Sequence, residues 1–516
     1  MSENFSRQFE VTKPALSSPH GMVTAQNQVA ADIGARVLRE GGNAVDAAIT
    51  TAFALAATEF WHSGIGGGGF MIVHQAKPDR TSVIDFGMVA ASRLNAEDYP
   101  LAEGKAGDLF GWPAVVENRN LKGYSSIAVP GQVDGMALAL AEFGSWSWAK
   151  VLDPAIELAE RGVLADWFTT LQIGCSAAEL GEFAASRAAF LPNGFPPVMD
   201  WIGTPIRVMV PNFAKTLRRL ADAGARDFYE GALADAIVDD LEAGGSWIRR
   251  DDLASYRSRL VEPLSFDHGT ARLHVAGGLT AGPSLRAALA HISGRTNGRR
   301  LDAASFAIYA QAIIETYRER LNIMGDCKTP SCTTNLCVVD REGNMVALTQ
   351  TLLGLFGSKV TLPQTGIVMN NGIMWFDPRP GRPNSIAPGK RPLSNMCPVI
   401  GTRDGTPWFA VGASGGRRIL PAVLQLASFL VDCGMNLDEA MRQARIDVSA
   451  EDQVVLDQML PDETVRALQR EFGAKVVPRG FRPLYFGCLT GVLRCESGLC
   501  WGAAETTVPW ASASGV

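Results

Sequence analysis

The strongest constraint on the fold is a stretch of β-forming residues arranged about one tight turn. Residues 331–340 end in Val-Val-Asp, the turn Asp-Arg-Glu-Gly-Asn spans 340–344, and residues 345–351 read Met-Val-Ala-Leu-Thr-Gln-Thr. Apolar β-formers on both sides of such a turn predict a hairpin of two buried strands rather than a helix. The hairpin begins at a pair of threonines, Thr333 and Thr334. Taken alone, such a pair is more typical of an ordinary strand start.

The composition is that of a globular protein, and it excludes several functional classes. Of 516 residues, 47% are hydrophobic and 19% charged, and a net charge of −6 offers no basic stripe for a nucleic acid. We find no apolar run long enough for a signal peptide or membrane span, so we expect no membrane association and a cytoplasmic location. The nine cysteines lack C-x-x-C spacing and the six histidines lack H-E-x-x-H spacing. We therefore expect reduced thiols, no metal and no cofactor.

Periodicity and capping signals predict the main helices. Asn43 is a suitable N-cap for a helix with a small-residue face, which can pack closely on a sheet. Asp153 followed by Pro154 resembles an N-cap with Pro at the first helical position. The helices are expected at residues 28–40, 44–57, 132–142, 155–161, 304–320 and 419–431.

Residues 64–69, Gly-Ile-Gly-Gly-Gly-Gly, match the G-x-G-x-x-G pattern of dinucleotide-binding loops. That pattern binds a pyrophosphate only where it follows a strand and opens a helix. Here the expected order is reversed, because a helix precedes the glycines and strands are expected at 70–74 and 82–86. We therefore interpret the match as coincidental.

Several motifs in the same order resemble the γ-glutamyltransferases, a family of self-cleaving N-terminal-nucleophile hydrolases. The resemblance extends from about Gly21 to Glu505, and its matching segments are 43–48, 64–69, 85–86, the threonine pair, 390–396 (Lys-Arg-Pro-Leu-Ser-Asn-Met) and 412–419 (Gly-Ala-Ser-Gly-Gly-Arg-Arg-Ile). It implies an α+β fold, a four-layer αββα sandwich of two packed sheets between helical layers. Length alone suggests roughly two to four domains, and that estimate would then be wrong.

The resemblance also implies a reaction mechanism. Self-cleavage between Cys332 and Thr333 would give a large subunit (1–332) and a small subunit (333–516), which together form one structural domain. Residues 326–332 are polar and contain a proline, which suits an exposed cleavage segment. A Thr hydroxyl is a weak nucleophile until a base takes its proton, and a free α-amine with a pKa of roughly 7.7–8.0 can be that base. Thr351 matches the residue that orients the nucleophile, and the N–H groups of Gly415 and Gly416 match the oxyanion hole.

The predicted substrate site departs from the family pattern. Ser394 matches a serine that contacts the substrate carboxylate, and Asn395 replaces a second one. The family's arginine clamp for that carboxylate is Gly87 here, and the residues that hold the substrate's α-amino group are replaced by Leu353, Gly372 and Trp375. Trp375 also fills volume and favours a shorter acyl group.

Lys359 and Arg417 stand where the family more often has small residues. Each is either a solvated surface cation or a group that receives a carboxylate placed differently.

Three hypotheses follow. The first is a threonine amidohydrolase for a small carboxylate-bearing amide, similar to the oxamate amidohydrolases of this fold. The second is a γ-glutamyltransferase or glutathione hydrolase with an altered glutamyl site. The third, a non-catalytic or nucleotide-binding protein, is disfavoured by the intact Thr333, Thr351 and Gly415–Gly416. The expected partners are a small-molecule amide and the two subunits of one precursor, with a dimer of cleaved heterodimers as one compatible assembly.

Overall fold

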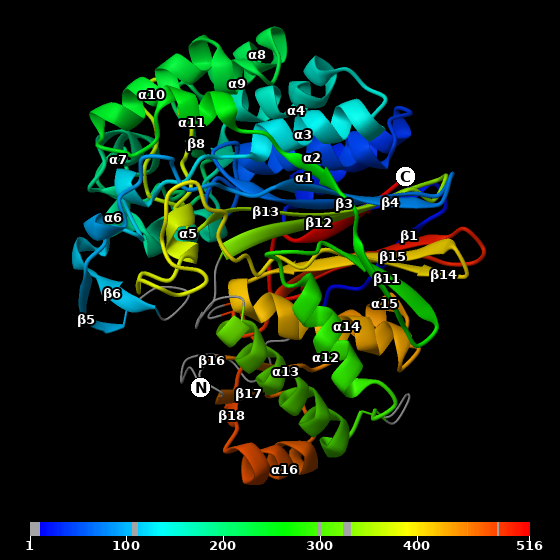
Figure 1. Ribbon diagram of the computed structural model, residues 1–516. Coiled ribbons are helices and arrows are strands. Elements are labelled where there is room, and N and C mark those ends of the chain that lie inside the picture. Colours follow the sequence, from blue (N-terminus) through cyan, green and yellow to red (C-terminus); the bar gives the residue numbers. More distant parts are fainter. Residues whose placement is uncertain (1–10, 106–111, 297–300, 324–331, 451–452, 482–483) are drawn as a thin grey trace.

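The computed structural model describes residues 11–105, 112–296, 301–323, 332–450, 453–481 and 484–516. Two seven-stranded sheets lie face to face between layers of helices (Figure 1), and neighbouring strands in both sheets are antiparallel. In strand order, the upper sheet of Figure 1 contains β21 (Ser512–Gly515), β2 (Gly21–Ala25), β12 (Cys332–Asp340), β13 (Met345–Leu353), β3 (Gly68–Gln75), β4 (Arg80–Phe86) and β9 (Arg259–Val261). The lower sheet contains β1 (Leu16–Ser18), β20 (Cys500–Ala504), β19 (Cys488–Arg494), β15 (Thr406–Ser414), β14 (Val399–Arg403), β11 (Ala271–Val275) and β10 (Leu264–His268).

Helices cover the outer face of each sheet, so the predicted αββα arrangement is confirmed. The upper sheet is covered by α1 (Gln28–Arg39), α2 (Ala44–Thr58) and α3 (Gln132–Phe143), with α4 (Trp148–Arg161) and α8 (Phe213–Ala223) packed outside them. The lower sheet is covered by α12 (Gly282–Ile292), α14 (Ile419–Val431) and α15 (Leu437–Arg442), with α13 (Ala303–Ile323) and α16 (Asp462–Phe472) outside. No helix among the described residues is both long and apolar enough to span a lipid bilayer.

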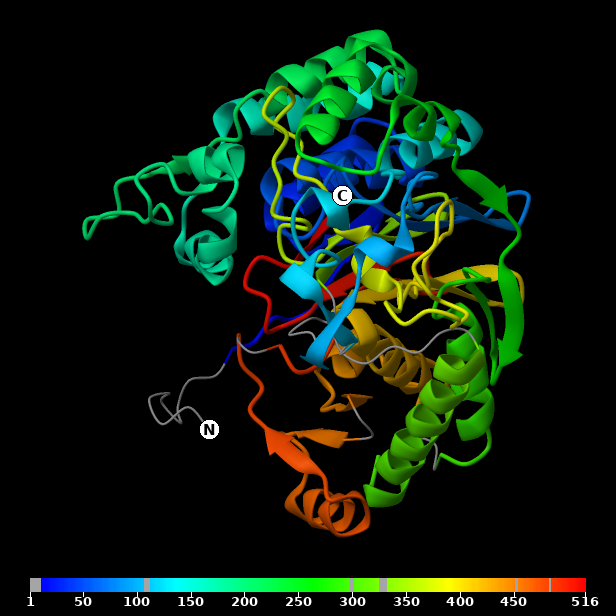
Figure 2. The ribbon, with the colours of Figure 1, turned by 60° about the vertical axis from the view of Figure 1, so that its left-hand side comes forward.

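The remaining elements are short. They are α5 (Trp167–Cys175), α6 (Ala177–Leu180), α7 (Ala184–Phe190), α9 (Asp227–Glu230), α10 (Ala232–Ala243), α11 (Arg250–Ser255), and the minor strands β5 (Leu101–Lys105), β6 (Pro113–Val115), β7 (Val163–Leu164), β8 (Arg207–Val208), β16 (Ile446–Ala450), β17 (Gln453–Asp457) and β18 (Lys475–Val477). In Figure 2 the teal segment of residues 165–206 projects from the sandwich.

Helix α2 shows how local sequence builds the core. The Asn43 side chain accepts hydrogen bonds from the N–H groups of Val45 (2.9 Å) and Asp46 (3.0 Å), and Asp46 accepts the Asn43 N–H in return (2.9 Å). This capping box pairs the N–H groups that a helix start leaves unsatisfied. All residues of α2 are buried, and its many alanines let it pack closely on β12 and β13.

The predicted start of α4 is wrong. The helix begins at Trp148 rather than at 155, with Ser147 as its N-cap, and Pro154 lies inside it. Pro154 cannot donate a backbone hydrogen bond, which costs helix stability. Val151, Leu152, Ala155 and Leu158 form a buried stripe facing α2 and α8, and this burial offsets the missing bond.

The chain segments before and after Cys332 interleave within the upper sheet. Strand β2 lies between β21 and β12, and β13 pairs with β3, so strands from the two segments are neighbours at three places in the sheet. Separating the two segments would therefore break three strand ladders of the upper sheet, those of β21 with β2, β2 with β12, and β13 with β3.

Candidate active site

The predicted hairpin is confirmed, and it contains an irregularity at its start. Leu336 faces Leu348 and Thr334 faces Gln350, but Cys332 then faces Leu353. Thr333 consequently lies opposite two residues, Thr351 and Leu352. Such a bulge re-aims side chains locally and recurs near active sites. The segment 324–331, which includes most of the predicted cleavage loop, lies outside the described residues.

Alternation along β12 places the Thr333 side chain between the two sheets. The Thr334 hydroxyl points toward the helices, where it donates to Glu59 Oε2 (2.7 Å) at the end of α2. The Asn335 amide points the other way and contacts the Thr490 hydroxyl of β19 at 2.7 Å. Because successive strand residues face opposite sides, Thr333 shares the inter-sheet face with Asn335. Thr333 is 1% exposed.

Thr351 lies at the end of the partner strand β13 and is also buried. Its hydroxyl oxygen accepts the backbone N–H of Leu353 at 2.7 Å. Leu353 adopts φ 84°, a left-handed conformation that is unusual for a branched side chain. The Thr351 hydroxyl therefore helps to hold the strand end that faces Cys332 and Thr333.

Gly415 and Gly416 follow β15 in the opposite sheet. They have φ values of 121° and 62°, which only glycine adopts readily, and they precede a short 3₁₀ turn (Gly416–Arg418) leading into α14. Backbone N–H groups at the start of a helical segment lack partners within it and favour negative charge. This loop can therefore supply N–H donors to a developing oxyanion.

A buried glutamine that sequence analysis missed links the two loops. Gln26 accepts the Thr334 hydroxyl (3.2 Å) and donates to Ser414 Oγ (2.5 Å) and to the Cys488 carbonyl (3.3 Å). One side chain thus joins the residue after Thr333 to the residue before Gly415. Its signal in the sequence was the polar pair Gln26-Asn27 at the end of an apolar strand. Asn27 has a local role as the N-cap of α1, whereas Gln26 has no such local role.

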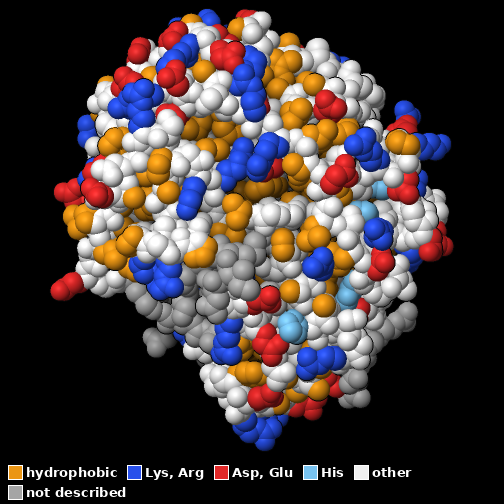
Figure 3. All heavy atoms as spheres, in the orientation of Figure 1, with side chains coloured by type: hydrophobic (Ala, Val, Ile, Leu, Met, Phe, Trp, Pro, Cys, Tyr) orange, Lys and Arg blue, Asp and Glu red, His pale blue; other side chains and the backbone are white. Residues whose placement is uncertain are grey.

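Three predicted substrate-site positions, Gly87, Trp375 and Ser394, line one cavity of about 390 Å³ between the sheets. The cavity wall is apolar at Phe70, Val83, Met88, Leu279 and Pro392, and polar at Asp85, Arg259 and Arg391. Met88 of this wall lies close to Gly68, since a Cβ added at Gly68 would be 3.0 Å from Met88 Cγ. Gly68 is the residue of β3 that pairs with Thr351. Figure 3, in the orientation of Figure 1, shows Lys and Arg side chains gathered near the middle of the visible face of the molecule.

Asn395, predicted with Ser394, is not among the residues that line this cavity. It is 5% exposed, and its Nδ2 has no hydrogen-bond partner in the described structure.

The structure does not bring Lys359 or Arg417 to this cavity, and both are buried rather than solvated. Lys359 Nζ donates to the Leu355 carbonyl (2.5 Å) and lies 3.5 Å from Glu179. Arg417 donates to the Ser449 carbonyl (3.1 Å), and its guanidinium lies 5.7 Å from the Tyr317 ring centroid. Neither cation is among the residues that line this cavity, and the assignment of either one as a carboxylate ligand stays a prediction.

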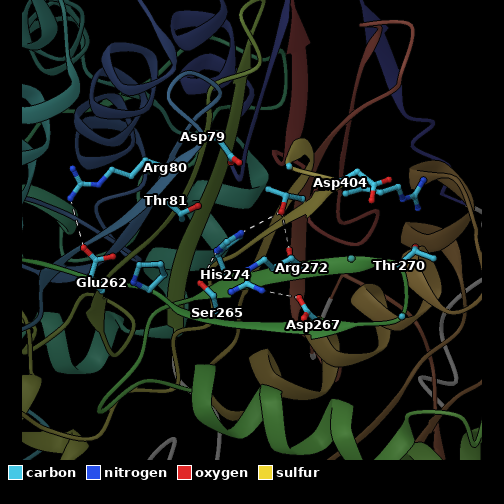
Figure 4. Close-up of a pocket in the computed structure, with 16 residues that line it drawn as sticks. Asp79, Arg80, Thr81, Glu262, Ser265, Asp267, Thr270, Arg272, His274 and Asp404 are labelled. Atoms are coloured by element: carbon cyan, nitrogen blue, oxygen red, sulfur yellow. Dashed lines mark hydrogen bonds and ion pairs between the residues drawn. The ribbon is translucent and has the colours of Figure 1, made fainter.

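A larger cavity of about 990 Å³ lies at the opposite end of β3 (Figure 4). Charged side chains from the β3–β4 and β14–β15 turns and from β10 and β11 line it, with His274 at its centre. None of the predicted catalytic or substrate residues lines this cavity. Volume alone therefore does not identify the reaction site. The smaller cavity is the better candidate because three predicted substrate-site positions line it, although Thr333, Thr351, Gly415 and Gly416 are not among its lining residues.

The four-layer αββα architecture is the fold of the N-terminal-nucleophile hydrolases. Within that class, the family model described as gamma-glutamyltranspeptidase matches residues 30–332 and 315–512. The chain belongs to this family and is an enzyme.

Two relatives and one solved structure illustrate the range of the family. The acylase ACY 1 proenzyme of Pseudomonas sp. strain SE83 is 33% identical, with 97% of this chain and 95% of the relative covered. The glutathione hydrolase proenzyme of Bacillus subtilis strain 168 is 29% identical, with 89% and 86% covered. The crystal structure of cephalosporin acylase from Bacillus halodurans superposes with a TM-score of 0.86 at 24% identity, covering 100% of this chain and 99% of that one. This last likeness supports the fold alone.

Proposed function

We propose that the chain is a self-processing threonine amidohydrolase that cleaves a carboxylate-bearing amide through an acyl-enzyme on Thr333. The observation that carries the proposal is the bulge that sets buried Thr333 against Thr351 on the inter-sheet face. Support also comes from the left-handed Gly415–Gly416 loop in the facing sheet and from relatives named as proenzymes.

Maturation would begin with attack of Thr333 Oγ on the carbonyl carbon of Cys332. The peptide nitrogen leaves with the hydroxyl proton, and water opens the resulting ester. The products are a carboxylate on Cys332 and a free α-amine on Thr333. Residues 1–332 and 333–516 would stay together, because their strands interleave in the upper sheet.

Turnover would reuse the same hydroxyl. The new α-amine takes the proton from Oγ, which bonds to the acyl carbon of the amide while Gly415 and Gly416 N–H groups stabilise the oxyanion. The amine product leaves with the proton, and water hydrolyses the ester to release the acid. One oxyanion donor typically contributes about 100- to 1,000-fold in rate.

Self-cleavage is tested by mass spectrometry and denaturing electrophoresis of the purified chain. We expect two co-purifying fragments, 1–332 and 333–516. Thr333→Ala should remain intact and inactive, whereas Thr333→Ser keeps a hydroxyl and should still cleave. An intact wild-type chain that hydrolyses amides, or an active Thr333→Ala variant, would overturn the proposal.

The substrate class rests on the altered site. Gly87, Leu353, Gly372 and Trp375 remove contacts that a glutamyl α-carboxylate and α-ammonium need, and unpaired buried charges are costly. Oxamate is the smallest candidate, and a 390 Å³ cavity also admits longer dicarboxylic monoamides. We expect a higher kcat/KM for oxamate, succinamate or glutaramate than for glutathione.

A second candidate is glutathione hydrolysis, favoured by the 29% identity to a glutathione hydrolase proenzyme. It replaces the first if kcat/KM for glutathione exceeds that of every monoamide by about tenfold, equivalent to about 1.4 kcal/mol in transition-state binding.

A further inference from the structure

Asp85 and two arginines form a charged cluster in the wall of the 390 Å³ cavity. Asp85 is the penultimate residue of β4 and faces Arg259 of β9, whose Nη2 donates to Asp85 Oδ2. Asp85 Oδ1 accepts the Gly87 N–H (3.0 Å) and Arg391 Nη1 (3.2 Å). Two guanidinium groups thus share a single carboxylate, which leaves the cluster with one positive charge in excess.

The Arg391 guanidinium lies directly beside Gly87. Arg391 Nη1 donates to the Gly87 carbonyl at 2.7 Å, and a Cβ at position 87 would lie 3.4 Å from Nη1 and 3.2 Å from Asp85 Oδ1. A larger side chain at position 87 would compete for that space. Position 87 thus lacks the arginine of the family pattern, and the guanidinium of Arg391, which is 304 residues further along the chain, lies beside it.

Both arginines keep donors available for a ligand. A guanidinium has five N–H donors. Arg391 donates through Nη1 to Asp85 and Gly87 and through Nη2 to the Arg257 carbonyl at 3.3 Å. Its guanidinium also lies 5.6 Å from the centroid of the Tyr256 ring. The Arg259 side chain is 54% exposed and forms a single hydrogen bond, to Asp85, within the described structure. Glu262 also lines this cavity, but its side chain is 82% exposed and lies 3.7 Å from Arg80, so solvent and Arg80 weaken its opposition to the excess charge.

We propose that Arg391 and Arg259 bind the carboxylate of the acyl group and so determine the acid specificity of this enzyme. The inference rests on the proposed function and extends it to a substrate class. Forked guanidinium donors match the geometry of a carboxylate. Phe70, Val83, Met88 and Trp375 provide an apolar wall for methylene groups between that carboxylate and the scissile amide. The ligand is an unbranched dicarboxylic monoamide, with no requirement for an α-amino group.

The kinetic test uses two anilides of equal chain length, glutaryl-p-nitroanilide and valeryl-p-nitroanilide, which differ only in the terminal carboxylate. The variants are Arg391→Gln and Arg259→Gln. The matched control is Arg257→Gln, because Arg257 is a neighbouring, 57% exposed arginine that pairs with Glu230 and does not line the cavity. We expect Arg391→Gln to lower kcat/KM for the glutaryl substrate by about 30-fold or more. The valeryl rate should stay within about twofold, as should both rates in the control variant.

A binding measurement separates this inference from the proposed function. Calorimetric titration of the wild-type protein with glutarate should give a dissociation constant that rises about tenfold or more in Arg391→Gln and Arg259→Gln. If the wild type binds glutarate in this way but hydrolyses no amide, the proposed function fails and the anion site stands. If it hydrolyses both anilides and Arg391→Gln changes their rates equally, the inference fails and the hydrolase stands. Should Arg391→Gln not fold, the more exposed Arg259→Gln decides the outcome by the same two measurements.

Discussion

The Thr351 hydroxyl is a buried polar group with a defined backbone partner. It accepts the Leu353 N–H at 2.7 Å, and that N–H belongs to a residue held at a positive φ. Leaving a buried donor unpaired costs about 1–3 kcal/mol. The Thr351 hydroxyl therefore contributes to the position of the strand end opposite Thr333, together with the backbone hydrogen bonds of Leu352 to His62 and Asn371.

We predict that Thr351→Val, which keeps the shape but removes the hydroxyl, slows both self-cleavage and kcat by about 5- to 150-fold, the range that 1–3 kcal/mol spans. Thr351→Ser keeps the oxygen and should remain within about threefold of the wild type. Time courses of fragment formation and steady-state rates measure both effects. Equal rates for Thr351→Val and the wild type would show that the hydroxyl has no role.

At the scale of elements, the candidate site depends on how three loops meet. The start of β12, the residue after β2 and the end of β15 come from different parts of the chain, and Gln26, the residue after β2, hydrogen-bonds to the other two. Because Gln26 is 1% exposed, water cannot replace its hydrogen bonds if the side chain is removed.

We predict that Gln26→Leu lowers kcat by about 10-fold or more while KM changes less, since the relative position of Thr333 and the Gly415 loop changes but the substrate cavity does not. The control is Gln28→Leu on the exposed face of α1, where the Gln28 side chain donates a hydrogen bond to Asp32 Oδ1 at 2.7 Å. The control should retain wild-type kcat. A parallel loss of thermal stability without any change in kcat would assign Gln26 a purely structural role.

At the scale of the whole molecule, two histidines meet where the sheets face each other. His74 of β3 and His274 of β11 have ring centroids 6.2 Å apart, and His274 Nδ1 lies 2.8 Å from the Ser265 hydroxyl. Burial lowers the pKa of His74. Burial, with His74 and Arg272 adding to it, lowers the pKa of His274 to about 4, although Asp79 and Asp267 oppose this shift.

The sign of the resulting pH dependence follows from linkage. Above the ordinary histidine pKa of about 6.5, His274 is neutral in both folded and unfolded chains, so it does not make the free energy of unfolding depend on pH. Between about 6.5 and 4 the unfolded chain binds a proton that the folded chain does not. The free energy of unfolding should therefore decrease as the pH falls through this window.

We predict that His274→Gln flattens this part of the stability profile. Urea unfolding midpoints of the uncleaved Thr333→Ala chain, measured from pH 7 to pH 4, test the prediction on a single polypeptide. His20→Gln, which changes an exposed histidine, should retain the original slope. An equally steep profile in His274→Gln would contradict the assignment.

The sequence by itself determined the features that depend on neighbouring residues. The hairpin about residues 340–344, the Asn43 cap and the order of helix, glycine run and strand were all correctly predicted, because turns and caps are satisfied within a few residues. The start of α4 was not, since Pro154 is tolerated only because the stripe around it is buried. Thr333 could be identified from its motif, and its chemical role remains a proposal.

Only the tertiary structure decided which charges meet. Asp85 and Arg259 are 174 residues apart, and pairing of β4 with β9 places them opposite each other. Arg391 lay within a recognised motif, yet nothing local to it indicated that it reaches Gly87. Lys359 and Arg417 looked equally available in the sequence but are buried against other partners. The reason is physical: hydrogen bonding and desolvation of a charge depend on groups brought together by strand pairing and sheet packing, and sequence spacing does not encode those distances.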